Sequence, residues 1–188
     1  EDFESGLGVG DPIPADVYFY EGTNSAGSDY ATIESGANVI TGLQSAKIWY
    51  NYTDSSIQQI SPMALAASTI LGIQVDFQFK LSGYKAGSHA LKAYYYDGSQ
   101  WLLIGSYTPG QNGVENGSVY STSTILSRDD YNLSDSAKLK FVSGSNRDTR
   151  IAYIDEVKVS KFVSPTGAID YSGITATGLR DLWCSQQE

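Results

Sequence analysis

Two carboxylates, one near each end of the chain, are the residue pair that could hold a metal ion. Asp155 lies in Arg-Ile-Ala-Tyr-Ile-Asp-Glu-Val-Lys-Val-Ser, residues 150–160, where alternation predicts a strand with Asp155 on its otherwise apolar inner side. Glu4 belongs to the opening motif Asp-Phe-Glu-Ser-Gly-Leu-Gly. Ca²⁺ binds about six to eight oxygen atoms, which carboxylates, backbone carbonyls and water supply. If the first and last strands of a β-sandwich lie side by side, Glu4, Asp155 and carbonyls near Gln44 or Ser45 could hold Ca²⁺.

The same two acids also have a simpler interpretation. Asp155 could accept hydrogen bonds from loop amides while Glu4 is solvated, because a buried carboxylate without any partner would be costly. The sequence leaves both interpretations open.

Four aromatic residues are candidates for binding a sugar, because the C–H faces of sugars stack on flat rings. In Tyr94-Tyr95-Tyr96, successive side chains of a strand point to opposite faces, so Tyr94 and Tyr96 share one face and Tyr95 takes the other. An exposed stripe of Trp49, Tyr94, Tyr96 and Trp101 would make a glycan-binding surface. The alternative is that most of these rings lie in the core or form cross-strand pairs that stabilise the sheet.

Catalysis has little support in the residue pattern. His89 is the only histidine, and no Ser/His/Asp or Cys/His arrangement surrounds it in the sequence. The Gly-Leu-Gly-Val-Gly run at 6–10 has no preceding strand or following helix, as a phosphate-binding loop would need. Carboxylates are plentiful, but nothing singles out a pair for glycoside hydrolysis. We therefore expect a protein that is not an enzyme.

Strand patterns fill most of the chain. The clearest is 73–81, Ile-Gln-Val-Asp-Phe-Gln-Phe-Lys-Leu, which alternates apolar and polar residues and predicts a strand with its apolar residues inward. Segments 90–96 and 101–107 flank Asp-Gly-Ser-Gln, which predicts a hairpin. Further strands are expected at 45–53, 118–126, 137–142 and 150–159, and we interpret 62–71 as a connection. Short strands without alternating helices indicate an all-β protein, an antiparallel β-sandwich of jelly-roll type.

Composition limits the possible partners. With 188 residues, of which 41% are hydrophobic, the chain can form one core. A net charge of -9 disfavours nucleic acid and anionic lipid surfaces, and no run approaches the roughly 20 apolar residues of a membrane span. Cys184 is the only cysteine, so no internal disulfide can form. Glycosylation sequons begin at Asn51, Asn116 and Asn132.

The pattern changes near residue 163. We expect a jelly-roll domain over 1–163 and an extended segment over 164–188 that serves as a linker, a packed tail or a strand exchanged with a neighbouring subunit. The last of these would make the protein a structural subunit of an extracellular fibre or surface layer.

Five motifs occur in the order found in a known group of domains. They are the opening motif at 2–8, Ser-Ala-Lys-Ile-Trp at 45–49, Val-Asp-Phe-Gln-Phe at 75–79, Tyr-Asp-Gly-Ser-Gln-Trp at 96–101 and Tyr-Ile-Asp-Glu-Val at 153–157. In this order they resemble the jelly-roll modules of secreted bacterial enzymes and adhesins, including MAM-like domains and carbohydrate-binding modules of families four and twenty-two. The resemblance covers about residues 2–160. It departs after Gly8, where Val-Gly-Asp-Pro-Ile-Pro replaces the usual Trp and Gly-rich turn.

The resemblance implies a secreted or cell-surface protein with a structural calcium ion bound by Glu4 and Asp155. The function we expect is a non-catalytic, extracellular carbohydrate-binding accessory module whose partner is a polysaccharide. The alternative is a structural or adhesive assembly subunit whose partners are copies of itself.

Overall fold

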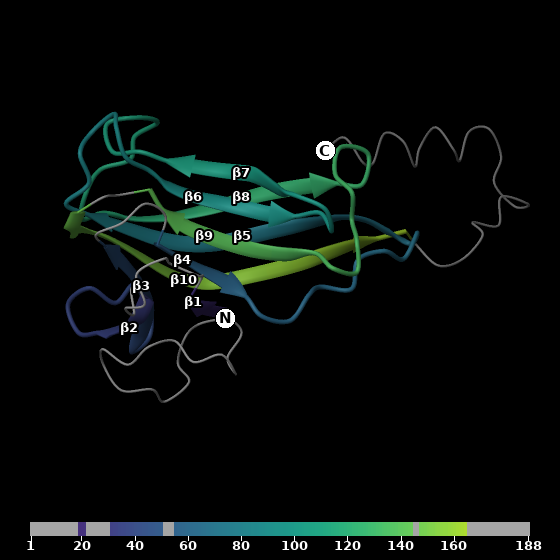
Figure 1. Ribbon diagram of the computed structural model, residues 1–188, viewed down its shortest axis with the longest axis horizontal. Helices are drawn as coiled ribbons and strands as arrows, with labels where there is room; N and C mark the ends of the chain where they lie inside the picture. Colours follow the sequence, from purple (N-terminus) through teal and green to yellow (C-terminus); the bar gives the residue numbers. More distant parts are fainter. Residues whose placement is uncertain (1–18, 22–30, 51–54, 145–146, 165–188) are drawn as a thin grey trace, which may run out of the picture.

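The computed structural model describes residues 19–21, 31–50, 55–144 and 147–164. In these ranges the chain forms two five-stranded antiparallel sheets stacked face to face, with the long strands β5, β8 and β10 running lengthwise across the view (Figure 1). We call them the β6 sheet, with strand order β1-β4-β9-β6-β7, and the β5 sheet, with order β2-β3-β10-β5-β8. Their bounds are β1 Phe19–Glu21, β2 Ala31–Ser35, β3 Gln44–Tyr50, β4 Ser55–Gln59, β5 Ile70–Ser82, β6 Leu91–Tyr96, β7 Trp101–Tyr107, β8 Val119–Ser127, β9 Lys138–Ser143 and β10 Arg147–Val163.

The core between the sheets has the pattern predicted from strand 73–81. Its inward side chains are at most 2% exposed, and they are Ile73, Val75, Phe77, Phe79 and Leu81. Phe77 of β5 meets Phe141 of β9 edge to face, with ring centroids 4.8 Å apart, so this contact joins the two sheets. The all-β class and the sandwich are confirmed.

The hairpin between β6 and β7 is also confirmed, and its turn is organised by Asp97. The Asp97 Oδ1 accepts hydrogen bonds from the backbone N–H groups of Ser99 at 2.7 Å and Gln100 at 2.8 Å. The Gln100 and Ser99 amides hold the pKa of Asp97 below its ordinary value. Gly98 takes φ +100°, a backbone conformation that would be strained in a residue with a side chain. This turn places Trp101 opposite Tyr96 in the ladder.

Strand β10 contains a bulge beside Asp155. Asp155 is paired with Gln78 of β5, but the next paired residue is Lys158, which lies opposite Asp76. Three steps along β10 thus face two along β5, so one residue is extra. Glu156 takes φ +50°, and the bulge is centred on it.

The bulge changes which residues of β10 face the core. Before it, Ala152 and Ile154 belong to the core, and after it Val157 does. Asp155 therefore lies on the outer face of the β5 sheet, next in register to Gln78, and not on the inner side as the alternation predicts. It is nevertheless fully buried, because other residues cover this part of the outer face.

The connection at 62–71 forms no helix, as expected. Arg128 holds part of it by donating hydrogen bonds to the backbone carbonyls of Ile70, Leu65 and Ala67 at 2.5–2.8 Å. In the described part of the chain, no helix could cross a membrane. The segment 165–188, including Cys184, lies outside the described residues.

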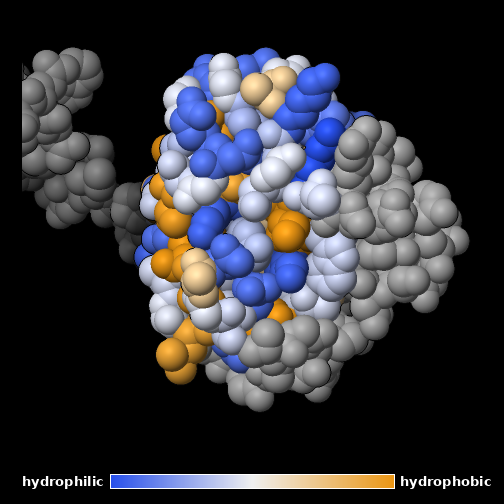
Figure 2. All heavy atoms as spheres, turned by 90° about the vertical axis from the view of Figure 1, so that its left-hand side faces the viewer, coloured by the Kyte–Doolittle hydropathy of each residue, from blue (hydrophilic) through white to orange (hydrophobic). Residues whose placement is uncertain are grey.

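The end of the sandwich at left in Figure 1 faces the viewer in Figure 2. Its described surface is mainly hydrophilic, with apolar groups gathered along one flank.

Candidate functional site

Three of the four predicted sugar-stacking residues lie together on the outer face of the β6 sheet. Along β6, buried and partly buried residues alternate, so Tyr95 is in the core while Tyr94 and Tyr96 point outward. Trp101 on the edge strand β7 lies opposite Tyr96, with ring centroids 5.1 Å apart and planes at 44°. We call Tyr94, Tyr96 and Trp101 the ring face.

A lysine from the neighbouring strand β9 lies over this ring face. The Lys140 Nζ is 4.3 Å from the ring centroid of Trp101 and 5.3 Å from that of Tyr94. Such cation–π contacts attract the ammonium to the faces of the rings. Sequence reasoning did not find Lys140, because only the pairing of β9 with β6 brings it beside the rings.

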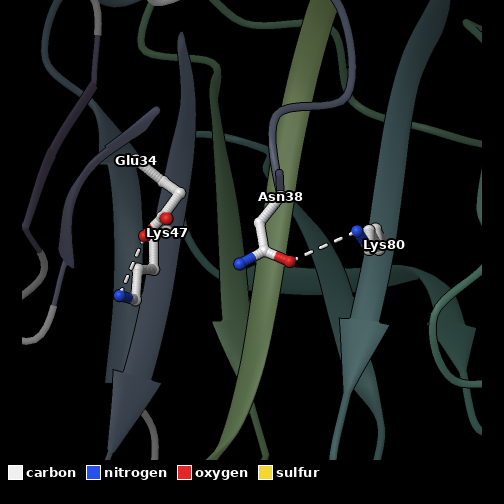
Figure 3. A network of polar contacts seen from close by, with 4 residues as sticks. All are labelled: Glu34, Asn38, Lys47 and Lys80. Atoms are coloured by element: carbon white, nitrogen blue, oxygen red, sulfur yellow. Dashed lines mark hydrogen bonds and ion pairs between the residues drawn. The ribbon is translucent and has the colours of Figure 1, made fainter. Parts of the chain in front are cut away.

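Trp49 does not join the ring face. It lies on β3 of the β5 sheet, with the Lys47 Nζ 5.1 Å from its ring centroid. Lys47 forms an ion pair with Glu34 of β2 at 2.9 Å (Figure 3). The expected stripe of four rings is therefore corrected to three, because Trp49 is in the other sheet.

Asp155 accepts four hydrogen bonds from described residues. Its Oδ2 accepts from the Thr41 N–H and Oγ1–H, each at 3.1 Å, and from the Ser45 Oγ–H at 2.9 Å. Its Oδ1 accepts one, from the Glu156 N–H at 2.9 Å. All the donors are neutral, and burial raises the pKa of Asp155 above its ordinary value.

These bonds attach the loop between β2 and β3 to the outer face of the β5 sheet. Figure 3 shows Asn38 of this loop in front of β10, with its Oδ1 directed toward Lys80 of β5 at 3.3 Å. Lys80 also donates to the Ala37 carbonyl at 3.5 Å. The loop is thus held on both sides of β10.

The predicted calcium site is described only in part. Glu4 lies outside the described residues, and no group of three His, Cys, Asp or Glu residues that could hold a metal occurs within them. The Asp155 carboxylate could also bind a cation, since its Oδ1 accepts only one hydrogen bond from the described residues and a carboxylate oxygen can accept more. Among the described residues, Asp155 accepts hydrogen bonds from loop groups, as the simpler interpretation of this residue expects.

The described hydrogen bonds of His89 are not those of a catalytic pair. Its Nε2 accepts a hydrogen bond from the Arg150 guanidinium at 2.7 Å, and its Nδ1 lies 2.8 Å from the Ser88 Oγ. A catalytic triad needs an acceptor on the far side of the imidazole, and arginine can only donate.

A second surface, a groove of about 410 Å³, lies over β5, β8 and β10. Its lining includes Asp76, Glu156 and Lys158. Hydrogen bonds from Ser123 and Gln74 lower the pKa of Asp76. Among the described lining residues the only aromatic one is Phe77, which faces the core, so these residues offer no ring to a sugar.

Two sequons fall within the described residues. The Asn116 Nδ2 donates to the Tyr84 carbonyl and the Asn132 Nδ2 to the Asp97 carbonyl, each at 2.8 Å. Asn51 lies outside them.

No family model matches the chain, and no curated protein matches its sequence. Solved structures resemble it in shape. The K3 cleaved adhesin domain of Lys-gingipain from Porphyromonas gingivalis is 13% identical, with 85% of this chain and 96% of that chain covered and a TM-score of 0.58. The CBM22-2 xylan-binding domain of Paenibacillus barcinonensis Xyn10C is 12% identical, with 86% and 97% covered and a TM-score of 0.51.

The Stig cyclase Fisc from Fischerella sp. TAU is 9% identical, with 86% of this chain and 93% of that chain covered and a TM-score of 0.58. The fold is a jelly-roll β-sandwich. Its relatives in shape include an adhesin domain, a xylan-binding module and a cyclase, so function must be argued from the residues of this chain.

Proposed function

We propose that the protein is a non-catalytic, extracellular carbohydrate-binding module that stacks sugar rings on Tyr94, Tyr96 and Trp101. The observation that carries this proposal is the gathering of these three side chains on one outer face, at the edge of the β6 sheet. A ring on the outside of a sandwich adds nothing to the core, whereas a flat apolar ring beside polar groups suits the alternating C–H and hydroxyl surface of a sugar.

Backbone pairing and a hydrogen-bonded turn position the ring face. Tyr94 and Tyr96 are in the interior strand β6, which is paired on both sides, and the turn closed by Asp97 fixes Trp101 beside them. Binding therefore requires little ordering of side chains, which favours affinity. The fold is compatible with the proposal, since a xylan-binding domain resembles this chain in shape.

Trp101→Ala is expected to weaken glycan binding at least about tenfold, which corresponds to roughly 1.4 kcal/mol. The measurement is affinity electrophoresis in gels that contain neutral or anionic plant, algal or bacterial polysaccharides, followed by calorimetry with those that retard the protein.

Trp49→Ala is the matched control, because Trp49 is also an outward tryptophan under a lysine but belongs to the β5 sheet. It should leave retardation unchanged. A protein that no polysaccharide retards, or one that Trp49→Ala weakens and Trp101→Ala does not, would contradict the proposal.

We further propose that Asp155 and Glu4 bind a structural calcium ion. Support comes from the buried carboxylate of Asp155, whose described partners are all neutral and whose Oδ1 accepts one hydrogen bond from the described residues. A cation would offset the cost of burying this charge. Bound Ca²⁺ would fasten the loop after β2 to β10 more tightly.

Chelation with EDTA is expected to lower the melting temperature by about 5–10 °C. A ligand present at about 100 times its Kd stabilises the folded state by roughly 2.7 kcal/mol. For a chain of this size, each kcal/mol changes the melting temperature by about 2–4 °C. Differential scanning calorimetry in calcium and in EDTA measures the change. The Asp155→Asn protein should melt at the same temperature in calcium and in EDTA. If EDTA does not change the melting temperature of the wild type, the calcium site is excluded.

The alternative function, an assembly subunit, depends on residues 164–188. Apart from Ser164, whose N–H donates to the Thr69 carbonyl at 2.7 Å, this segment lies outside the described residues. It stays a prediction.

A further inference from the structure

We propose that two copies of this chain associate through β8, an edge strand of the β5 sheet, and form a dimer with a two-fold axis. The proposal goes beyond carbohydrate binding and does not depend on it. It comes from the character of the strands at the edges of the two sheets.

Four strands lie at sheet edges within the described residues, and three of them have features that oppose pairing with another chain. β1 is three residues long, and β2 is five residues long and carries Glu34, which forms an ion pair with Lys47. In β7, Ile104 is an extra residue where the register shifts between Ala93 and Tyr94 of β6, so this strand is bulged. Short length, charge and bulges are the usual means by which edge strands avoid pairing.

β8 has none of these features. Its nine residues, Val119–Ser127, include no charged residue, proline or glycine. All nine pair with β5 without a shift in register. Valine, isoleucine, tyrosine and threonine also favour an extended backbone. Within the described ranges no strand pairs with the other side of β8, so it presents a long, regular row of backbone N–H and C=O groups to a partner strand.

The side chains of β8 also suit a partner strand. Those that point outward are exposed, and two of them are apolar, since Val119 is 49% exposed and Ile125 is 63% exposed. Thr122 and Thr124 point inward but are only half-buried, because β8 lies at the flank of the sandwich. β7 lies on the same flank, where the Tyr107 hydroxyl is 3.0 Å from the Thr122 Oγ1 (Figure 1). A partner strand would cover this flank beside β8.

The sequence of β8 is complementary to itself when two copies run antiparallel. If a two-fold axis passes through Thr122, this residue lies opposite its own copy, and Ser121 lies opposite Ser123 of the second copy. Val119 then lies opposite Ile125, and because the contact is symmetric, this apolar pair forms twice. Cross-strand pairs of threonine and of apolar residues stabilise a sheet. The register that joins the two exposed apolar side chains is thus the reason for choosing a second copy as the partner.

Pairing of this kind ends at two copies. Each chain has one β8 edge, and the second copy occupies it. Two five-stranded sheets joined at β8 would make one sheet of ten strands, and twisted open sheets rarely exceed about 10 strands. A closed dimer therefore protects the edge that length, charge and bulges leave unprotected.

Charge opposes this association only weakly. Each copy has a net charge of -9, but β8 itself is uncharged. The carboxylate that β5 presents beside β8 is Asp76, opposite Ser123. Three strand spacings, about 14 Å, would separate it from the Asp76 of the second copy. Charges beyond roughly 10 Å are largely screened at about 0.1 M ionic strength, so we expect the dimer to become tighter as NaCl is raised.

The test changes the sign of one charge in the pair that the two-fold axis brings together. Val119→Glu/Ile125→Glu, the like-charge variant, would place like charges opposite each other at both apolar pairs. Val119→Glu/Ile125→Lys, the opposite-charge variant, would place opposite charges there. Within one chain these positions are six residues, about 20 Å, apart, so their charges interact only between copies. Val163→Glu, at an exposed apolar residue of β10, is the matched control.

Analytical ultracentrifugation of the full chain measures the dimer Kd. We expect wild type to change from monomer to dimer between about 1 μM and about 1 mM. The Kd of the like-charge variant should be at least about tenfold higher than that of the opposite-charge variant, while Val163→Glu leaves the wild-type Kd unchanged. In wild type, backbone amides of residues 119–127 should exchange hydrogen more slowly at high protein concentration than at low concentration.

Wild-type protein that stays monomeric at about 1 mM overturns the inference, as does a dimer that the two double variants form equally well. A dimer that Val163→Glu weakens and the like-charge variant does not would place the contact at the end of β10, and it would overturn the inference too. Melting temperatures within about 2 °C of wild type will establish that the variants are folded. The proposed carbohydrate binding stands or falls separately, by the retardation of the Trp101→Ala protein.

Discussion

Replacing Phe79 with Ala is expected to lower the free energy of unfolding by about 3–5 kcal/mol, the range for a large buried aromatic side chain. Phe79 is 1% exposed, and its ring lies 4.5 Å from Tyr107 of the β6 sheet and 5.3 Å from Tyr120 of the β5 sheet, between centroids. The substitution removes contacts to both sheets at once. The vacated space would also join an existing surface pocket of about 220 Å³ whose lining includes these rings. Urea denaturation of the two proteins measures the loss.

Phe79→Leu is the matched control, since it keeps much of the volume and should cost less than half as much. If Phe79→Ala costs under about 1 kcal/mol, the sandwich does not depend on this contact between its sheets.

The position of Phe79 is the kind of structural fact that the sequence predicts well. Residues 73–81 alternate strictly, and each polar position between the apolar ones faces outward as expected. The hairpin at Asp97 was equally predictable, because an Asp-Gly pair between two apolar runs specifies a turn through its own hydrogen bonds. These signals are local, so no knowledge of the rest of the fold was needed.

The face of Asp155 could not be predicted, because its signal is not local. Up to Ile154, the residues of β10 that face outward are apolar, as are those that face the core. The outer side is also covered here, because the loop after β2 packs on it. The bulge at Glu156 then exchanges the two faces. Alternation predicts facing only in a strand without bulges.

The ring face was predictable in part for the same reason. The shared side of Tyr94 and Tyr96 follows from their spacing in one strand, and Trp101 follows from the hairpin. Whether Trp49 joins them depends on strand order, and so does the place of Lys140. Strand order in a sandwich is set by long-range pairing, which the sequence of a single strand does not encode.

Asp155→Ala is expected to lower the free energy of unfolding by about 3 kcal/mol, because it leaves one buried donor and three partly buried donors without an acceptor. The Thr41 and Glu156 N–H groups and the Ser45 hydroxyl lose their partner, and the loop after β2 loses its attachment to β10. Relief of the buried charge offsets part of the loss, so the figure is below the sum over four bonds. Urea denaturation in EDTA measures this effect apart from any calcium.

Asp155→Asn separates charge from shape. One amide oxygen can replace Oδ2, but the NH₂ group then faces the Glu156 N–H, so the loss should be smaller than for Ala but not zero. An Asp155→Asn protein as stable as wild type in both EDTA and calcium would mean that the carboxylate is not needed.

The pH dependence has a definite sign. Because burial raises the pKa of Asp155, the folded protein holds this proton more tightly than the unfolded chain does. The contribution of Asp155 to the free energy of unfolding therefore increases as pH falls through the raised pKa, and it is constant below the ordinary pKa of the unfolded state. Asp76 and Asp97, whose pKa values are lowered, lose stabilising free energy as pH falls through those values. Subtracting the free energy of unfolding of Asp155→Asn from that of the wild type at each pH removes the contributions of Asp76 and Asp97. In EDTA, we expect this difference to change in favour of the wild type as the pH is lowered. A difference that shifts the other way would mean that hydrogen bonds to the ionised carboxylate outweigh its burial.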